Sequence, residues 1–471
     1  MQNARKVVII GFGNIGQAVI PLLQRTFPQW PIIAVDQHGN PERVDLAKAL
    51  GITLITSRIT ESNFRNGLYP LLSPGDFLLN LASAVSSCAL IRLAHEADAL
   101  YLDTGIEPWE YDLASASSTS NYALREQMLT LKRNNGNTPT ALVAHGANPG
   151  FVSVLVKAAL LEMARKLIAQ PDDLRTPATR SEWAALAAQL DVRVIQISER
   201  DTQRTLAHRD PGVFVNTWSV DGFVAECLQE AELGWGTHEG SLPVNARTHR
   251  DGCRAAIQLD TRGHETVVKT WTPLHGEFSA CVLTHNESIS IADYLTLENG
   301  GNVAYRPTVY YAYRPTDSAI QSLSLLPEIA HSSPEHQRVL KHDIADGIDE
   351  LGVLVMSGLG VSLWLGSALS IDRARAVAPL NNATSLQVVS SIVGGMKWML
   401  DHPRAGIVES DHLDHVALLE AVLPYWEPIQ CRYTDWTPDP LKRDLVLREF
   451  LQPRHSLESH QAHEPEAIIS I

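Results

Sequence analysis

Short apolar runs alternate with longer stretches of helical periodicity along the first 150 residues. The apolar runs are Val7–Ile10, Ile32–Asp36, Ile52–Ile55, Phe77–Asn80, Ala99–Asp103 and Thr140–Ala144. Short continuous runs of this kind are typical of strands buried on both faces, and helices between them connect such strands in parallel. The pattern therefore predicts an α/β domain with a doubly wound parallel sheet over residues 1–150.

The regular alternation stops near residue 150, where we place a domain boundary. Helical periodicity extends from Gly150 to about Lys166 and recurs at Ser181–Leu190 and Asp221–Leu233. Strand-like runs follow at Asp191–Ser198, Val213–Ser219, Thr266–Thr272, Ala280–Thr284 and Thr308–Tyr313. We expect a second, α+β domain over residues 151–395 for substrate binding and dimerisation. Residues 396–471 are expected to pack back on the first domain, with a poorly ordered tail from about residue 453.

The loop after the first apolar run reads Gly-Phe-Gly-Asn-Ile-Gly from Gly11 to Gly16. In a dinucleotide fingerprint these glycines permit a tight turn, close approach of a pyrophosphate, and close packing of helix on strand. Asp36 stands where an acid accepts ribose hydroxyls, and no basic residue directly follows it. This order of elements predicts a Rossmann domain that binds NAD rather than NADP. The residues expected to bind the cofactor are Gly11, Gly13, Asn14, Ile15, Gly16, Asp36, Asn80 and Asn148.

Composition narrows the class of protein. The net charge of −15 argues against a nucleic-acid partner and is compatible with a small cationic substrate. No run of about 18 apolar residues indicates a membrane span, and the first strand begins too early for a signal peptide, so we expect a cytoplasmic protein. The cysteines are scattered without a Cys-x-x-Cys pair, and His412 and His415 have no partner cluster. Neither a disulfide framework nor a metal site is expected.

The densest group of candidate catalytic residues lies between Glu199 and Glu226. Glu199 and Trp218 each end a predicted strand, and Glu226 is a carboxylate in an apolar helical turn. A buried carboxylate requires a cation, a hydrogen-bond network or a raised pKa, and an indole face attracts an ammonium or iminium ion. Two carboxylates around a tryptophan would suit an amine. Structural interpretations stay open, with Glu199 paired to Arg200 or Arg204 and Trp218 in the core.

Three further candidates follow predicted strands. Glu107 follows a strand of the cofactor domain and is expected on the nicotinamide side of the cleft. His285 follows a strand of the second domain, where it could shuttle a proton near neutral pH or serve as a hydrogen-bonded structural histidine. Asn148, followed by Pro149, could act in the site or as the cap of the next helix.

Sequence motifs throughout the chain resemble one family. They are Gly11–Gly16, Glu107–Trp109, Asn121–Arg125, Gly146–Gly150, Ser198–Arg204, Asn216–Val220, Ala231–Thr237, Thr284–Ser290, Asp346–Gly352 and Tyr433–Thr437. These runs are similar to those of the bacterial homospermidine synthases, a family of the saccharopine-dehydrogenase-like fold group. The resemblance covers almost the whole chain except the C-terminal tail.

The resemblance implies a redox-neutral reaction. Putrescine, a diamine, would be oxidised by tightly held NAD to an imine with loss of ammonia. A second putrescine would add, and the retained NADH would reduce the new imine to homospermidine. The resemblance places active-site carboxylates at Glu107, Glu199 and Glu226. The family's active-site residues beside these carboxylates fall on Asn148, Trp218 and His285. A homodimer is expected separately, because sheet-rich second domains of this kind often carry a dimer interface.

One position departs from the family. Ala84 stands where these enzymes often have an acid, which removes a possible amine anchor and affects the expected diamine preference.

Two alternatives remain. A carboxyspermidine or saccharopine dehydrogenase of the same fold group would need arginines for substrate carboxylates, and Arg200 and Arg204 are the motif arginines available. A protein that senses a dinucleotide without turnover would keep its properties when Trp218 or Glu226 is changed.

Overall fold

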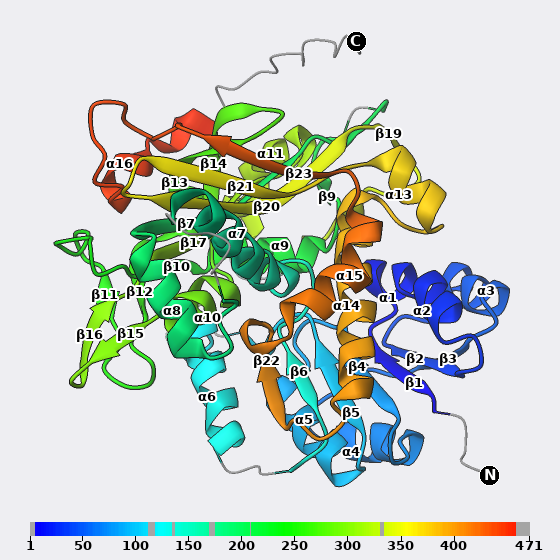
Figure 1. Ribbon diagram of the computed structural model, residues 1–471. Helices are drawn as coiled ribbons and strands as arrows, with labels where there is room; N and C mark the ends of the chain where they lie inside the picture. Colours follow the sequence, from blue (N-terminus) through cyan, green and yellow to red (C-terminus); the bar gives the residue numbers. More distant parts are fainter. Residues whose placement is uncertain are drawn as a thin grey trace.

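The computed structural model describes residues 5–111, 118–133, 137–168, 175–207, 209–329 and 334–457. Its first domain is built on a seven-stranded parallel sheet in the order β22-β6-β5-β4-β1-β2-β3, which confirms the predicted α/β class (Figure 1). The strands are β1 Val7–Ile10, β2 Ile32–Asp36, β3 Thr53–Thr56, β4 Phe77–Asn80, β5 Leu100–Asp103, β6 Ala141–Val143 and β22 Ile407–Glu409.

The sheet is buried on both faces because its strands are apolar at nearly every position. Val7 and Ile9 of β1 belong to one hydrophobic cluster, whereas Val8 and Ile10 belong to another. The helices around the sheet include α1 (Asn14–Ala18), α2 (Ile20–Thr26), α3 (Pro41–Ala49), α5 (Ser87–Glu96) and α6 (Asn121–Arg133). All strands run in parallel, so their carboxyl ends meet at one edge, where ligands bind in such sheets.

The second domain contains a mixed sheet of eleven strands, with the path β11-β12-β10-β17-β7-β20-β21-β23. Its central strands are β7 (Val192–Asp201), β17 (Thr308–Arg314) and β20 (Ile348–Ser357). The remaining strands are β10 Glu230–Gly234, β11 Arg247–Thr248, β12 Ala256–Arg262, β13 Val267–Thr272, β14 Gly276–Leu283, β21 Val361–Ser370, β23 Ile429–Thr434 and β24 Leu451–Gln452. Helices α7 (Phe151–Leu167) and α8 (Arg180–Gln189) precede this sheet in the chain.

Two predicted elements of the second domain are wrong in extent. The helix expected over Asp221–Leu233 ends as α9 (Val220–Leu228), because Gln229 leaves the helical conformation and the chain continues into β10. The strand expected over Val213–Ser219 is only β9 (Phe214–Asn216), which pairs with β18 (Gln337–Val339) outside the main sheet. In both cases, pairing with a distant strand decides the local structure.

The C-terminal segment contributes strands and helices to both domains. Helix α14 (Ala383–Asp401) contacts α1 and α2 of the first domain as well as β20 and β21 of the second, and α15 (His415–Trp426) packs on α14 (Figure 1). Strand β22 joins the first sheet, and β23 joins the second. Of the tail that the sequence predicts to be poorly ordered from about residue 453, residues 458–471 lie outside the described ranges, and Arg454–Leu457 forms a short helix with Leu457 buried.

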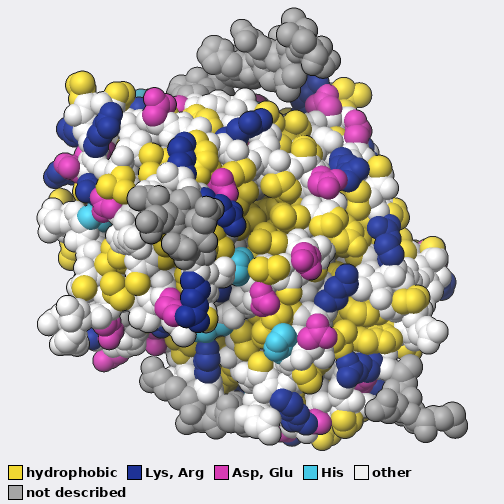
Figure 2. All heavy atoms as spheres, viewed as in Figure 1, with side chains coloured by type: hydrophobic (Ala, Val, Ile, Leu, Met, Phe, Trp, Pro, Cys, Tyr) yellow, Lys and Arg dark blue, Asp and Glu magenta, His cyan; other side chains and the backbone are white. Residues whose placement is uncertain are grey.

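The surface carries charges of both signs. Figure 2 shows Lys and Arg side chains interspersed with Asp and Glu over the visible face. Within the described ranges, no helix combines the length and apolar character that a membrane span requires.

Candidate active site

A cavity of about 710 Å³ lies between the two domains. Residues that follow β4, β5 and β6 line it from the first domain, and residues of β7, β17 and α9 line it from the second. All six predicted catalytic residues contribute to this lining. They are Glu107, Asn148, Glu199, Trp218, Glu226 and His285.

The glycine loop has the backbone shape that its sequence predicts. Gly11 has φ of +92°, and a Cβ atom there would lie 2.9 Å from the carbonyl oxygen of Leu81. A Cβ atom on Gly16 would collide with the carbonyl oxygen of Gly11, whereas one on Gly13 would meet nothing within 4 Å. The loop is therefore tight at its two ends and open at Gly13, where a pyrophosphate would approach.

The other predicted cofactor residues lie around this loop. Ile15, Asn80 and Asn148 line the cavity, and Asn14 donates a hydrogen bond to Thr217 O of the second domain at 3.3 Å. Asp36 Oδ2 accepts from the backbone N–H of Phe12 at 2.6 Å.

Asp36 also has a basic partner that the sequence analysis missed. Arg43 Nη1 lies 2.7 Å from Asp36 Oδ1. Arg43 is seven positions beyond Asp36, and α3 brings its side chain back to the end of β2.

Glu107 forms the carboxylate wall on the first-domain side. Its Oε2 atom accepts hydrogen bonds from the backbone N–H of Ala84 and the hydroxyl of Tyr111, both at 2.8 Å. Burial raises the pKa of Glu107 to about 7 despite these hydrogen bonds. Ala84 itself lines the cavity, so an acid at this position would add a further charge to the lining; its φ is 55°.

Glu199 lies on β7 and is 1 % exposed. Its Oε2 atom accepts hydrogen bonds from Asn148 Nδ2 at 2.9 Å and from the Tyr311 hydroxyl at 2.7 Å. Burial raises the pKa of Glu199 to about 8. The carboxyl group is therefore mostly protonated at neutral pH and can exchange its proton there.

Two further acids lie beside Glu199 on the same face of the sheet. Asp201 is two residues further along β7, and Asp349 of β20 is directly paired with Asp201. Thr384 Oγ1 donates a hydrogen bond to Asp349 Oδ2 at 2.5 Å. Burial and the neighbouring acids raise the pKa of Asp349 well above its usual value. Sequence reasoning missed Tyr311 and Asp349, although the predicted strand Thr308–Tyr313 contains the first of them.

Glu226 and His285 form an ion pair at the cavity wall. His285 Nε2 lies 3.1 Å from Glu226 Oε2, and His285 Nδ1 lies 3.1 Å from Glu287 Oε1. Burial alone would lower the pKa of His285, but the two carboxylates raise it well above its usual value. Burial raises the pKa of Glu226, an effect that His285 opposes. The pair holds a proton that could move between the histidine and a bound amine.

Trp218 presents an aromatic surface to the same cavity. Its Nε1 atom lies 3.4 Å from the Tyr313 hydroxyl, and its ring meets Phe223 edge-on at 6.1 Å. A Cβ atom on Gly222 would lie 2.8 Å from the indole ring, so glycine is required for this approach to α9. Trp218 is partly buried and borders the cavity, so packing and cation binding are compatible roles for it.

The charges around the cavity favour a cation. Acidic residues dominate the charged lining, with Arg58 as a basic member. The acids are Glu107, Glu110, Glu199, Asp221 and Glu226.

The arginines required by the dehydrogenase alternative point elsewhere. Arg200 donates to the carbonyl oxygens of Asp201 and Pro315, and Arg204 pairs with Asp346. In the described part of the chain neither forms an ion pair with Glu199. The structural interpretation of Glu199 as an arginine partner is therefore wrong.

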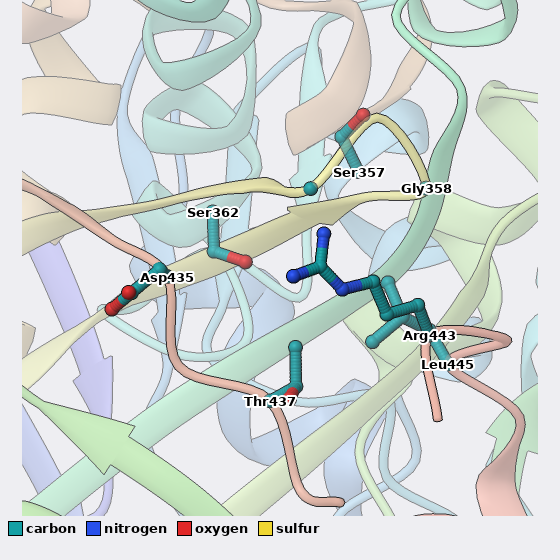
Figure 3. A pocket seen from close by; sticks show the side chains of 8 residues that line it. Ser357, Gly358, Ser362, Asp435, Thr437, Arg443 and Leu445 are labelled. Atoms are coloured by element: carbon teal, nitrogen blue, oxygen red, sulfur yellow. The ribbon is translucent and has the colours of Figure 1, made fainter. Parts of the chain in front are cut away.

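A second, much smaller cavity lies beside the turn between β20 and β21. Asp435, Arg443, Ser362 and Thr437 surround it (Figure 3). Its volume of about 30 Å³ has room for one or two water molecules but not for a diamine.

Comparisons with known proteins agree with this architecture. Residues 7–142 match the saccharopine dehydrogenase NADP binding domain, and residues 146–431 match the saccharopine dehydrogenase C-terminal domain. The chain is 45% identical to homospermidine synthase of Blastochloris viridis over 92% of both chains. It is 41% identical to homospermidine synthase of Mesorhizobium japonicum over 92% of this chain and 91% of the relative. The crystal structure of homospermidine synthase from Legionella pneumophila in complex with NAD has a TM-score of 0.88 and 38% identity, over 95% of this chain and 98% of that one.

Proposed function

The chain belongs to the homospermidine synthase family, and we propose that it converts two molecules of putrescine into homospermidine and ammonia with NAD that is restored in each cycle. The observation that carries this proposal is the cavity between the domains, where Glu199, Glu226 and Trp218 meet. A carboxylate-lined cavity with an indole on its wall suits a diamine whose intermediates carry positive charge.

The residues of this chain bind and orient the substrate. Glu199 and Glu226 receive the ammonium groups, and the His285–Glu226 pair moves protons to and from the reacting amine. Trp218 stabilises the iminium form, a contribution of ~0.5–2 kcal/mol. Glu107 closes the first-domain side of the cavity. Asn148 fixes the carboxyl group of Glu199 through its side-chain amide.

The dinucleotide supplies the redox chemistry when bound, accepting a hydride from the first amine and returning it to the final imine. The first putrescine loses a hydride and a proton to become an imine. The amine of a second putrescine adds to that carbon, ammonia leaves, and the new imine regains the hydride and a proton. The open space at Gly13 and the carboxylate of Asp36 fit the pyrophosphate and the ribose hydroxyls of this cofactor.

The test is incubation of the purified protein with putrescine and a trace of NAD, without another electron acceptor. Mass spectrometry should detect homospermidine and ammonia in many-fold excess over NAD, because each cycle restores the cofactor. NADPH consumption with an aldehyde and an amine, but no homospermidine from putrescine, would instead support the reductase alternative. Binding of NAD without any product would support the sensor.

A homodimer is expected because sheet-rich second domains of this kind often carry a dimer interface, and light scattering measures its mass. We also propose a cytoplasmic location, which cell fractionation tests.

A further inference from the structure

A lysine of the second domain reaches the dinucleotide-binding loop of the first. Lys341 lies between β18 and β19 (Ile344–Asp346), and its Nζ atom donates a hydrogen bond to Gln17 Oε1 at 3.0 Å. Gln17 Nε2 in turn donates to the carbonyl oxygen of Phe12 at 2.9 Å, inside the Gly11–Gly16 loop. The Lys341 ammonium is thus connected to the glycine loop through one side-chain amide.

The segment that carries Lys341 is held firmly. Arg375 Nη2 donates to the Lys341 carbonyl oxygen at 2.8 Å. The backbone N–H of Leu340 donates to Asn216 O at 2.8 Å, and Asn382 Nδ2 donates to Leu340 O at 3.1 Å. These bonds fix the backbone at Leu340 and Lys341, so the Lys341 ammonium group is held in a defined position facing the first domain.

The charge of Lys341 lacks a carboxylate in direct contact. Within the described residues its ammonium group forms no ion pair, although the side chain is half-buried. Burial and the nearby charge of Arg43 lower the pKa of Lys341 to about 8, and Glu42 opposes this only partly. Arg43 itself is paired with Asp36. Lys341 and Arg43 therefore both lie near a loop built for a dinucleotide, and of the two only Lys341 has no contacting carboxylate among the described residues.

We infer that Lys341 is a phosphate-binding residue of the cofactor site, contributed by the second domain. This inference rests on the proposed use of a dinucleotide. Such a phosphate occurs as the pyrophosphate, which the open backbone at Gly13 admits, and as the 2′-phosphate of NADP, which Arg43 would attract but the Asp36 carboxylate disfavours. In the first case the second domain holds the dinucleotide against the first, which would keep NADH bound until the final imine is reduced.

The test measures dinucleotide binding directly, by fluorescence titration with NADH and with NADPH and by the rate of NADH release into excess NAD. Lys341→Met is compared with wild type, with the conservative Lys341→Arg, and with Lys48→Met. Lys48 is an exposed lysine of α3 that pairs with Asp45, so its variant removes one charge from the first domain without touching the loop. If Lys341→Met does not fold, Lys341→Gln replaces it, because glutamine keeps a donor for Gln17.

Loss of a charge-assisted hydrogen bond to phosphate should weaken binding by roughly tenfold or more, with faster release, whereas Lys341→Arg and Lys48→Met remain near wild type. Equal weakening for NADH and NADPH identifies the pyrophosphate, and weakening for NADPH alone identifies the 2′-phosphate. Unchanged affinity for both, with wild type binding NADH, overturns the inference. A wild-type protein that binds neither dinucleotide would overturn the proposed function itself.

Discussion

Replacing Glu199 by glutamine is expected to abolish turnover while stabilising the protein at alkaline pH. Glu199 Oε2 accepts both hydrogen bonds, from Asn148 and from Tyr311, so a proton on the carboxyl group belongs on the other oxygen, beside Asp349. A glutamine that places its oxygen at the Oε2 position keeps both bonds, and its NH₂ group imitates the protonated oxygen. The substitution therefore preserves the packing and removes the ability to carry charge.

The magnitude follows from the raised pKa. A glutamate in the unfolded chain releases its proton near pH 4.5, whereas folded Glu199 keeps it up to about pH 8. Between these values the folded state holds more protons than the unfolded state, so stability falls as pH rises. One pKa unit corresponds to about 1.4 kcal/mol. The raised pKa of Glu199 therefore lowers the free energy of unfolding by about 4–5 kcal/mol at pH 8 and has no effect on it below pH 4.5. Glutamine avoids this cost because it does not ionise.

Thermal unfolding near pH 5 and near pH 8 is the appropriate assay, together with homospermidine formation from putrescine. The advantage of Glu199→Gln over wild type should be small at the acidic pH and largest at the alkaline pH, and product formation should be lost at both. Glu61→Gln is the matched control, since Glu61 is an exposed glutamate. An advantage that does not grow with pH would show that native Glu199 is ionised, and the account of its environment would be wrong.

Three further outcomes follow from the same geometry. Glu226→Gln should retain NADH binding but lose turnover. The pKa of His285, measured by NMR, should fall in this variant because one of its two neighbouring carboxylates is gone. An unchanged histidine pKa would contradict the ion pair. Trp218→Ala should be about 2- to 30-fold less active than Trp218→Phe, because phenylalanine keeps part of a cation–π interaction worth ~0.5–2 kcal/mol. Equal losses of activity in the two variants would indicate that Trp218 acts by packing alone. Gly16→Ala should abolish NADH binding in a titration, because its methyl group would collide with the Gly11 carbonyl, and normal affinity would refute the close packing of this loop.

Much of the first domain could be predicted from the sequence because its information is local. The runs Ile32–Asp36 and Phe77–Asn80 coincide with β2 and β4, since continuous apolar segments between helices have few alternatives to buried parallel strands. Parallel strands end at one edge of the sheet, which explains why Glu107 and Asn148, each just beyond a strand, line one cavity.

The partners that set the chemistry of the site were decided by tertiary structure. Tyr311 lies 112 residues from Glu199, and Asp349 reaches Glu199 only because β20 pairs with β7 in one register. Tertiary pairing also places β22, a strand of three residues that joins the edge of the first sheet although it lies far along the chain from the other strands.

The sequence by itself determined the dinucleotide loop, the parallel sheet and the family, because turn geometry, periodicity and motif spacing act over short distances along the chain. Only the folded structure decided the pKa of Glu199, the Glu226–His285 pair and the contact of Lys341 with Gln17. The physical reason is that burial, ion pairing and hydrogen bonding depend on which groups share a volume from which water is excluded, and distant segments enter that volume together only when both domains pack.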